Sequence, residues 1–209
     1  MQTLYPILAA IAAYLIGSIS FAVIVSRVMG LKDPRTFGSR NPGATNVLRS
    51  GSKAAAVVTL SLDAVKGFLP VFLVMRFGKP YGLGDGTIAM VGLAAFLGHL
   101  WPVFFRFKGG KGVATFIGVV FGINVLLGIA TAATWLIIAF FFRYSSLASL
   151  VSAAFSLAYY LLGSRVQWYA DARIAIALFA MAMLLAYRHR ENISRLLQGK
   201  ESRLGAKKA

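Results

Sequence analysis

The 209-residue sequence contains no cysteine and very few acidic residues. The lack of cysteine excludes disulfide bonds, a thiolate nucleophile and any metal or iron–sulfur site with cysteine ligands. Only 6 Asp and Glu residues stand against 22 Lys and Arg, which gives a formal net charge of +16. Because the carboxylates are few and scattered along the chain, we predict no metal site and expect no cofactor. The basic excess alone is typical of proteins that bind nucleic acid or anionic lipid.

Charged residues are also scarce overall, at 13% of the chain, whereas hydrophobic residues make up 58% and the mean hydropathy is +0.74. A soluble globular domain is far less apolar, so the composition excludes a soluble enzyme and indicates a membrane protein. Membrane lipid is therefore an expected partner and nucleic acid is not. The oligomeric state stays open.

Long apolar runs are separated by short polar or glycine-rich joints, and they lie at about 4–29, 54–76, 87–105, 113–142, 146–163 and 172–188. No soluble domain fits between them, so residues 1–209 are expected to form a single all-α transmembrane domain, a bundle of membrane-spanning helices. The first run is expected to remain as a helix, because residues 1–26 lack the Lys or Arg that begins a secretory signal.

The run 113–142 is too long for a single straight span. As one helix it would extend about 45 Å, against a hydrocarbon core of about 30 Å. We expect it either to tilt strongly or to break near Asn124 to Gly128 into two short helices, each barely long enough to cross.

The distribution of Lys and Arg favours the break, because basic residues are enriched in cytoplasmic loops. With seven crossings, seventeen of the 22 basic residues fall on one side of the membrane. With six, the basic C-terminal segment from Arg188 to Lys208 would lie outside. We therefore predict a polytopic integral membrane bundle of seven transmembrane helices, with the N-terminus outside and the C-terminus in the cytoplasm.

Three polar segments lie on the predicted cytoplasmic side, and the first runs from Phe37 to Arg49. Its Pro, Gly, Asn and Ser residues predict a turn that opens the next helix, where hydroxyls, backbone N–H groups and Arg side chains can surround an anion. An ordinary basic loop is the alternative, but the concentration of donors favours an anion site. The candidate residues are Ser39, Arg40, Asn41, Gly43, Thr45, Asn46 and Arg49.

The second segment runs from Gly98 to Thr115 and is rich in glycine. Glycines let a backbone approach a phosphate, and the helix that follows offers free N–H groups and the positive end of its dipole. The nucleotide pattern G-x-x-x-x-G-K-[ST] is absent, so ATP hydrolysis is not supported. A flexible basic turn is an equally good interpretation of this segment alone. The candidate residues are His99, Lys108, Gly109, Gly110, Lys111 and Gly112.

The third segment, from His189 to Glu201, is typical of a basic helix beside the membrane that is attracted to anionic lipid. On such a helix Glu191 and Arg195 form an i,i+4 pair. His189, Glu191 and Asn192 are the candidates for a role in a site.

Asp63 and Lys66 lie inside the apolar run 54–76, three residues apart, so that they can face each other on a helix. Ionisable residues at membrane depth are costly unless paired, and they often line a functional site. A structural pair that fixes helix packing is the alternative, and both can hold.

Together these residues resemble a known family. The three segments contain GSRNPGATNVLR, GHLWPVFFRFKGGKGVAT and HRENISRLLQGKE, which look like the three cytoplasmic motifs of the bacterial acyl-phosphate:glycerol-3-phosphate acyltransferases. Gly17-Ser18 and the LDAVKG around Asp63 and Lys66 are similar as well, so the resemblance covers essentially the whole chain. No departure removes a polar motif residue.

The resemblance implies transfer of a fatty acyl group from acyl phosphate to the 1-hydroxyl of glycerol 3-phosphate. The products are lysophosphatidic acid and phosphate, and the reaction is the first step of phospholipid synthesis. It implies a multi-pass protein of the bacterial plasma (inner) membrane whose active site faces the cytoplasm. The acyltransferase pattern H-x-x-x-x-D is missing, because Phe104 and Ser194 stand five residues after the two histidines. A single displacement is therefore expected, without an acyl-enzyme.

Within that reaction we expect Lys111 and the glycines to stabilise phosphate charge, and Ser39, Arg49 and Asn46 to position substrate. His189 or Glu191 orients or deprotonates the hydroxyl, although the substrate's own phosphate is an equal candidate for the base. The residues expected to be catalytic are Ser39, Arg49, Lys111, His189, Glu191 and Asn192. Those expected to bind substrate are Arg40, Asn41, Gly43, Thr45, Asn46, His99, Lys108, Gly109, Gly110, Gly112, Asp63 and Lys66.

The competing interpretation is a transporter or channel for a small anion such as phosphate or glycerol 3-phosphate. Seven helices, the intramembrane pair and a broken helix are compatible with it. Polar groups cluster on one face only, however, whereas alternating access needs a site near the midplane. A nonenzymatic protein that binds anionic headgroups is a second alternative, which accounts for basic tails but not for the glycine loop.

Overall fold

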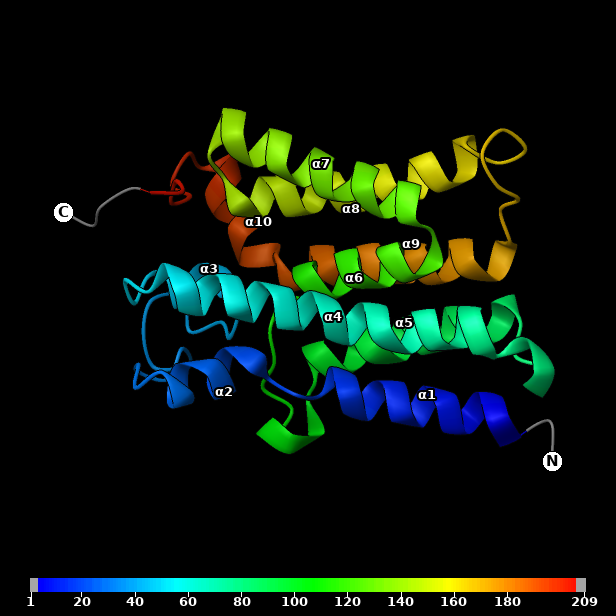
Figure 1. The fold of residues 1–209 in the computed structure, drawn as a ribbon. Helices are drawn as coiled ribbons and strands as arrows, with labels where there is room; N and C mark the ends of the chain where they lie inside the picture. Colours follow the sequence, from blue (N-terminus) through cyan, green and yellow to red (C-terminus); the bar gives the residue numbers. More distant parts are fainter. Residues whose placement is uncertain (1–3, 206–209) are drawn as a thin grey trace.

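The computed structural model describes residues 4–205 of the chain as helices that lie along one another in a bundle (Figure 1). The elements are α1 (Leu4–Gly17), α2 (Phe21–Val28), α3 (Ala44–Leu48), α4 (Lys53–Phe77), η1 (Lys79–Tyr81), α5 (Asp85–Leu100), η2 (Val103–Phe105), α6 (Val113–Ile123), α7 (Val125–Phe142), α8 (Ser145–Leu162), α9 (Ala172–Arg188) and α10 (Arg190–Leu197). No strand is formed within residues 4–205, which confirms the predicted all-α class. Lys207 and Lys208, which belong to the predicted basic C-terminal segment, lie outside the described residues.

Several of these helices are suited to cross a membrane. Four spans are long and apolar enough by themselves, namely α4, α5 continued through η2, α7 and α8. Two bent pairs raise the number to six, because α1 with α2 and α9 with α10 each meet the same requirement together. α6 is apolar but has only 11 residues. The described helices therefore form a membrane-protein bundle with several spans.

The predicted break in the run 113–142 is confirmed at Asn124, whose extended backbone separates α6 from α7. The Asn124 side chain accepts a hydrogen bond from the Leu127 N–H at 3.0 Å and so caps α7. The two helices are unequal, with 11 and 18 residues. At 1.5 Å per residue α6 is only about 16 Å long, so the expectation that each half just crosses is wrong for α6. Its start is fixed by Gly112, which has a left-handed backbone with φ +87°.

The first apolar run does not form the single helix that we expected. It breaks between Gly17 and Phe21, and the resulting helices α1 and α2 are bent by 40°. The carbonyl of Ile19, freed by the break, accepts a hydrogen bond from Lys66 Nζ at 2.7 Å. A buried polar contact therefore replaces the helical hydrogen bond, as backbone groups inside a membrane protein require.

Small residues let the central helices approach closely. A Cβ built at Gly67 of α4 would collide with the Thr115 carbonyl of α6, and one at Gly118 of α6 would collide with the Ala64 carbonyl of α4. Such contacts are the usual basis of helix association in lipid, where burial of apolar surface gives little driving force. The buried aromatic pair Phe96 and Phe116, with ring centroids 6.3 Å apart, packs α5 against α6.

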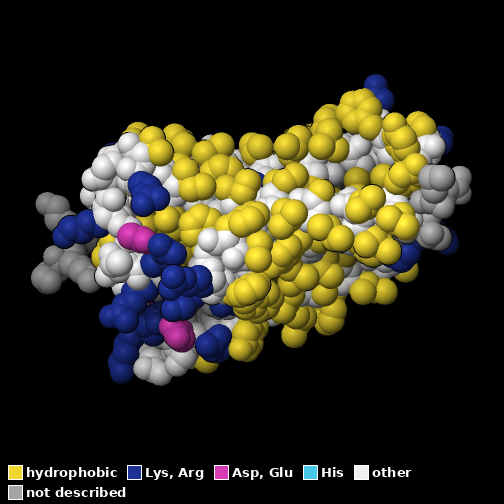
Figure 2. Space-filling view, turned by 90° about the horizontal axis from the view of Figure 1, so that it is seen from below, with side chains coloured by type: hydrophobic (Ala, Val, Ile, Leu, Met, Phe, Trp, Pro, Cys, Tyr) yellow, Lys and Arg dark blue, Asp and Glu magenta, His cyan; other side chains and the backbone are white. Residues whose placement is uncertain are grey.

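Charge is concentrated at one end of the bundle. Figure 2 shows Lys and Arg gathered at the end that carries α2 and α3, while apolar side chains cover most of the remaining length. The apolar surface is freely exposed, for example at Phe140 and Phe141 of α7, which are 77% and 73% exposed. A surface of this kind suits contact with lipid chains, and the basic end suits a headgroup region or water.

Candidate active site

A pocket of about 180 Å³ brings the three polar segments together at the end of the bundle where α3 and α10 lie. Its wall is formed by Ser39, Arg40, Asn41, Gly109, Lys111, Arg188, Arg190 and Glu191. Four of these side chains are basic and one is acidic, so the pocket attracts anions. Residues that are 150 positions apart in the chain thus line one small basic cavity.

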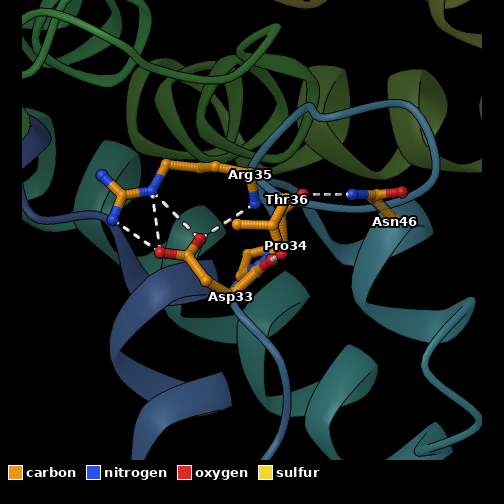
Figure 3. A network of polar contacts seen from close by, with 5 residues as sticks. All are labelled: Asp33, Pro34, Arg35, Thr36 and Asn46. Atoms are coloured by element: carbon orange, nitrogen blue, oxygen red, sulfur yellow. Dashed lines mark hydrogen bonds and ion pairs between the residues drawn. The ribbon is translucent and has the colours of Figure 1, made fainter.

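The first segment is folded around a buried side chain, Asn46 of α3, which is 2% exposed. Its Nδ2 group donates to the carbonyls of Pro34 at 2.6 Å and Phe37 at 3.2 Å, and its Oδ1 accepts from the Ser39 N–H at 3.0 Å. Figure 3 shows Asn46 pointing at the loop from α3. Asn46 therefore shapes the loop that carries Ser39 into the pocket wall.

A second contact stiffens the same loop at its start. The Asp33 carboxylate accepts hydrogen bonds from the guanidinium of Arg35, with Nη2 at 2.6 Å from Oδ2 (Figure 3). This hydrogen bond, together with that from the Arg35 backbone, lowers the pKa of Asp33 despite partial burial. Arg40, at the pocket, has a left-handed backbone with φ +54°, which is uncommon for a residue other than glycine and typical of functional loops.

The glycine turn of the second segment is clamped between α5 and α9. Arg188 donates from Nη2 to the Gly109 carbonyl at 2.8 Å and from Nε to the Gly110 carbonyl at 3.1 Å. From the other side the Gly110 N–H donates to the His99 carbonyl at 3.1 Å. A Cβ at Gly109 would collide with the His99 carbonyl, and one at Gly110 with His99 Nε2, so the turn requires glycine at both positions.

Lys111 follows this turn and reaches into the pocket wall. Its Nζ donates a hydrogen bond to Oδ1 of Asn192 in α10. Burial lowers the pKa of Lys111 to about 8, while the negative charge of Glu201 opposes the shift. Lys111 therefore remains mostly protonated at neutral pH but sits close to its titration point.

Asn192 belongs to a network that ties α10 to α8. Its Nδ2 donates to Glu201 Oε1 at 2.6 Å, and the same oxygen accepts from Ser146 Oγ at 2.8 Å. Arg195 Nε donates to Glu201 Oε2 at 2.7 Å. The expected pair of Glu191 with Arg195 is thus replaced by one with Glu201, because the chain reverses after α10 and returns this carboxylate to the helix.

His189 lies buried, 3% exposed, at the joint between α9 and α10. Its Nδ1 is 2.8 Å from the Leu185 carbonyl. Because a carbonyl only accepts, Nδ1 carries the proton and Nε2 keeps a lone pair in the neutral ring. Burial lowers the pKa of His189 to about 4, and the charges of Lys111 and Arg188 act in the same direction. The imidazole is therefore neutral at pH 7 and chemically able to accept a proton.

The other predicted site residues are not part of the pocket wall, namely Gly43, Thr45, Asn46, Arg49, Asp63, Lys66, His99, Lys108, Gly110, Gly112, His189 and Asn192. Thr45 Oγ1 lies 3.4 Å from Ser145 Oγ of α8. Arg49 Nη2 donates to Ser202 Oγ at 3.1 Å, in the chain that follows α10. These contacts link α3 and its C-terminal end to α8 and to the chain that follows α10.

Asp63 and Lys66 form the predicted i,i+3 pair, with Lys66 Nζ 2.7 Å from Asp63 Oδ1. The carboxylate also faces His99 of α5, whose Nδ1 lies 3.7 Å away. All three side chains are buried, and the His99 ring lies against Gly110 of the glycine turn.

Four residues of this region were not among the predicted site residues. Arg188 and Arg190 line the pocket, and Ser146 and Glu201 complete the network around Asn192. In the sequence, basic residues at the cytoplasmic end of a helix are already explained by the positive-inside rule. Nothing therefore marked Arg188 and Arg190 as residues of the pocket wall. For Glu201 a signal was present, because it ends the third motif and is one of only 6 acidic residues.

The sequence pattern of a family described as glycerol-3-phosphate acyltransferase matches residues 7–199. The chain belongs to this family. A glycerol-3-phosphate acyltransferase of Albidiferax ferrireducens is 65% identical over 207 residues, which cover 99% of this chain and 92% of that relative. One of Cupriavidus pinatubonensis is 62% identical over 202 residues, covering 97% of this chain and 98% of the relative.

Two solved structures support the assignment of the chain to the glycerol-3-phosphate acyltransferase family. PlsY (YgiH), an integral membrane glycerol 3-phosphate acyltransferase, has been crystallised in a glycerol 3-phosphate form and a lysophosphatidic acid form. The two structures are 38% identical to this chain, match it with TM-scores of 0.87 and 0.86, and cover 96% of it. The match covers 96% and 95% of those chains. The protein is therefore an integral membrane acyltransferase, and the transporter interpretation finds no support.

Proposed function

We propose that this acyltransferase transfers a fatty acyl group from acyl phosphate to the 1-hydroxyl of glycerol 3-phosphate, forming lysophosphatidic acid and phosphate. The observation that carries the proposal is the pocket in which the three segments meet, with one basic side chain from each segment (Arg40, Lys111 and Arg190) and a fourth, Arg188, from the end of α9. Both substrates bear phosphate, and clustered cations with backbone N–H groups bind phosphate well. The reaction begins phospholipid synthesis.

The chemistry is a direct displacement. The hydroxyl oxygen of glycerol 3-phosphate attacks the carbonyl carbon of acyl phosphate, and the bond from that carbon to the phosphate oxygen breaks. The hydroxyl proton goes to a base, and phosphate leaves with the bonding electron pair. Because acyl phosphate is a mixed anhydride with a good leaving group, orientation and charge neutralisation suffice, and no cofactor is needed.

The pocket wall provides the charge neutralisation. Lys111 and the glycine turn stabilise phosphate charge, and Arg188 and Arg190 add two further cations on the wall. Ser39, Arg40, Asn41, Gly43, Thr45, Arg49, Lys108 and Asn192 bind or orient the substrates, and Asn46 orients them indirectly, through the loop that it shapes.

Three groups are candidates for accepting the hydroxyl proton or orienting the hydroxyl, namely His189, Glu191 and the phosphate of glycerol 3-phosphate. His189 is neutral at pH 7, with a free lone pair on Nε2, so it can accept the hydroxyl proton. Glu191 lies on the pocket wall and can orient the hydroxyl. The phosphate of glycerol 3-phosphate is the alternative base, and it needs no side chain.

In the membrane we propose seven crossings, made by α1 with α2, α4, α5, α6, α7, α8 and α9. Because α6 alone is too short to span the hydrocarbon core, its crossing is completed by the chain on either side of it. The chain then forms one transmembrane domain over residues 1–209, in the bacterial inner membrane. Its N-terminus lies outside, and its pocket and C-terminus face the cytoplasm. The gathering of Lys and Arg at the pocket end supports this orientation.

The experiment that tests the pocket uses purified protein in detergent, with acyl phosphate and glycerol 3-phosphate as substrates. Lys111→Ala and Arg49→Ala are expected to lower kcat/KM by roughly 10- to 1000-fold, because each removes charge stabilisation near the reacting groups. Lys79→Ala and Arg165→Ala are the matched controls. Each removes a lysine or arginine charge that lies outside the three segments and is not part of the pocket wall. Full activity of both Lys111→Ala and Arg49→Ala would contradict the assignment.

A further inference from the structure

A buried ionic cluster lies behind the pocket and is not used by the chemistry proposed above. Asp63, Lys66 and His99 are 2%, 3% and 7% exposed, and none of them lines the pocket wall. His99 lies against the glycine turn, whose Gly109 is part of that wall. Asp63 Oδ1 lies 2.7 Å from Lys66 Nζ and 3.7 Å from His99 Nδ1, and within the described part of the chain His99 Nδ1 has no closer hydrogen-bond partner.

His99 contacts the glycine turn in two ways. Its carbonyl accepts the N–H of Gly110 at 3.1 Å, and its ring occupies the place that a side chain on Gly110 would need. Since Gly109 packs against the same carbonyl, the position of His99 determines how deep the turn lies. Lys111 follows directly, so its reach into the pocket depends on this turn.

Asp63 and Lys66 in turn connect His99 to the start of the chain. Asp63 is paired with Lys66 at 2.7 Å, and Lys66 Nζ donates at 2.7 Å to the Ile19 carbonyl in the break between α1 and α2. The cluster thus joins three places, namely the break, the middle of α4 and the glycine turn. A buried ion pair is weak evidence for stability, because apolar side chains of similar size often serve as well.

We propose that Asp63, Lys66 and His99 are positioning residues that hold the Gly109–Gly110 turn, and with it Lys111, in the geometry that binds substrate phosphate. They act through the turn and do not contact substrate. This inference rests on the proposed function, because it assigns phosphate binding to the same turn.

The first test removes the ion pair without leaving an unpaired buried charge. The double variant Asp63→Asn/Lys66→Met keeps side-chain size and avoids the penalty that a single substitution would carry. We expect its thermal unfolding midpoint to stay near that of the unmodified protein. The dissociation constant for inorganic phosphate, measured by calorimetry in detergent, should rise roughly 10- to 100-fold, as expected when a binding group is displaced. Unchanged phosphate binding in the folded double variant would overturn the inference.

A control removes a more exposed ion pair elsewhere. Asp171 and Arg173 are bonded at 2.7 Å at the start of α9, away from the pocket wall. Asp171→Asn/Arg173→Met retains a good helix cap and should leave phosphate binding unchanged. An equal loss of phosphate binding in this control would show that any lost ion pair has the same effect, which also overturns the inference.

A second test separates positioning from packing at His99. His99→Asn keeps a donor near the position of Nδ1, facing Asp63, whereas His99→Leu keeps bulk without a polar atom. We expect His99→Asn to retain most phosphate binding and His99→Leu to lose it. Equal behaviour of the two variants would contradict a role for the contact with Asp63.

The two proposals fail in different ways. If the unmodified protein binds inorganic phosphate but forms no lysophosphatidic acid, the proposed function is wrong, while the effect of the double variant on phosphate binding still tests the turn. If the unmodified protein is active and the double variant binds phosphate normally, only the inference about the buried cluster is wrong.

Discussion

Lys111 and Arg188 contribute to the same pocket through different properties of their side chains. Lys111 offers a compact charge whose pKa is lowered to about 8 by burial. Arg188 offers a planar fork that holds the carbonyls of Gly109 and Gly110 together. Because a lysine titrates readily when buried and an arginine does not, exchanging the two residue types has separate consequences at the two positions.

The charge state of Lys111 predicts an alkaline limit to activity. Its ammonium group is protonated below pH 8 and loses its charge above it, so phosphate binding and kcat/KM should be steady from about pH 7 to 7.5 and decline above about pH 8. Lys111→Arg keeps a cation at all these pH values and should move the decline beyond about pH 10. Initial rates from pH 7 to 10 provide the measurement. An unmodified protein that keeps its full rate at about pH 9.5 would contradict this role.

The fork of Arg188 predicts sensitivity to a substitution that keeps the charge. Arg188→Lys cannot hold both carbonyls, so it should lower kcat/KM by about tenfold, corresponding to about 1.4 kcal/mol. Arg76→Lys, on an exposed arginine at the end of α4, is the control and should have no effect. Steady-state kinetics of the two purified variants decide the matter, and equal activity would mean that only the charge of Arg188 counts.

At the scale of elements, the close packing of α4 and α6 fixes the base on which the glycine turn rests. Gly67 and Gly118 let the two backbones touch, and α6 starts directly after Gly112 of the turn. The position of α6 against α4 therefore sets where the second segment leaves the bundle.

This packing predicts a stability loss from a very small change. Gly118→Ala places a methyl group against the Ala64 carbonyl and should destabilise the fold by about 1–3 kcal/mol, as overpacking usually does. Gly84→Ala is the control, because no atom lies within 4 Å of the added Cβ. Thermal unfolding midpoints in detergent compare the two variants. A Gly118→Ala midpoint equal to that of Gly84→Ala would refute the close contact.

Elements that follow from local rules were predictable from the sequence, and those set by tertiary contacts were not. The break at Asn124 follows from the thickness of the membrane and the distribution of charge, and the Asp63–Lys66 pair follows from helix spacing. The break before Phe21 depends on a carbonyl partner from another helix, Lys66. Likewise Arg195 leaves its expected i,i+4 partner because the reversed chain returns Glu201.

For the site, too, the features set by local sequence were predictable and those set by tertiary contacts were not. Its three segments were recognisable by their donors, glycines and shared side of the membrane, and the structure brings them to one pocket. Which residues form the wall depends on how the segments fold onto each other. Asn46 illustrates this, because its side-chain amide makes its hydrogen bonds to the backbone of the loop, whereas Arg190 is part of the pocket wall.

At the scale of the whole molecule, the uneven distribution of charge predicts the orientation in the membrane. Because the chain has no cysteine, Leu197→Cys in α10 and Tyr169→Cys before α9 each introduce a single thiol at positions that are 84% and 89% exposed. A membrane-impermeant maleimide should label Leu197→Cys in inverted vesicles and Tyr169→Cys in right-side-out vesicles. Labelling of both thiols from the same side would contradict the orientation.

The central claim about the whole molecule is that an acyl group passes from acyl phosphate to glycerol 3-phosphate in the basic pocket. The most direct measurement is a phosphorus NMR time course of the purified protein with both substrates. It should show acyl phosphate and glycerol 3-phosphate disappearing together, with lysophosphatidic acid and inorganic phosphate appearing in equal amounts. Phosphate release at the same rate without glycerol 3-phosphate, or without any lysophosphatidic acid, would contradict the central claim.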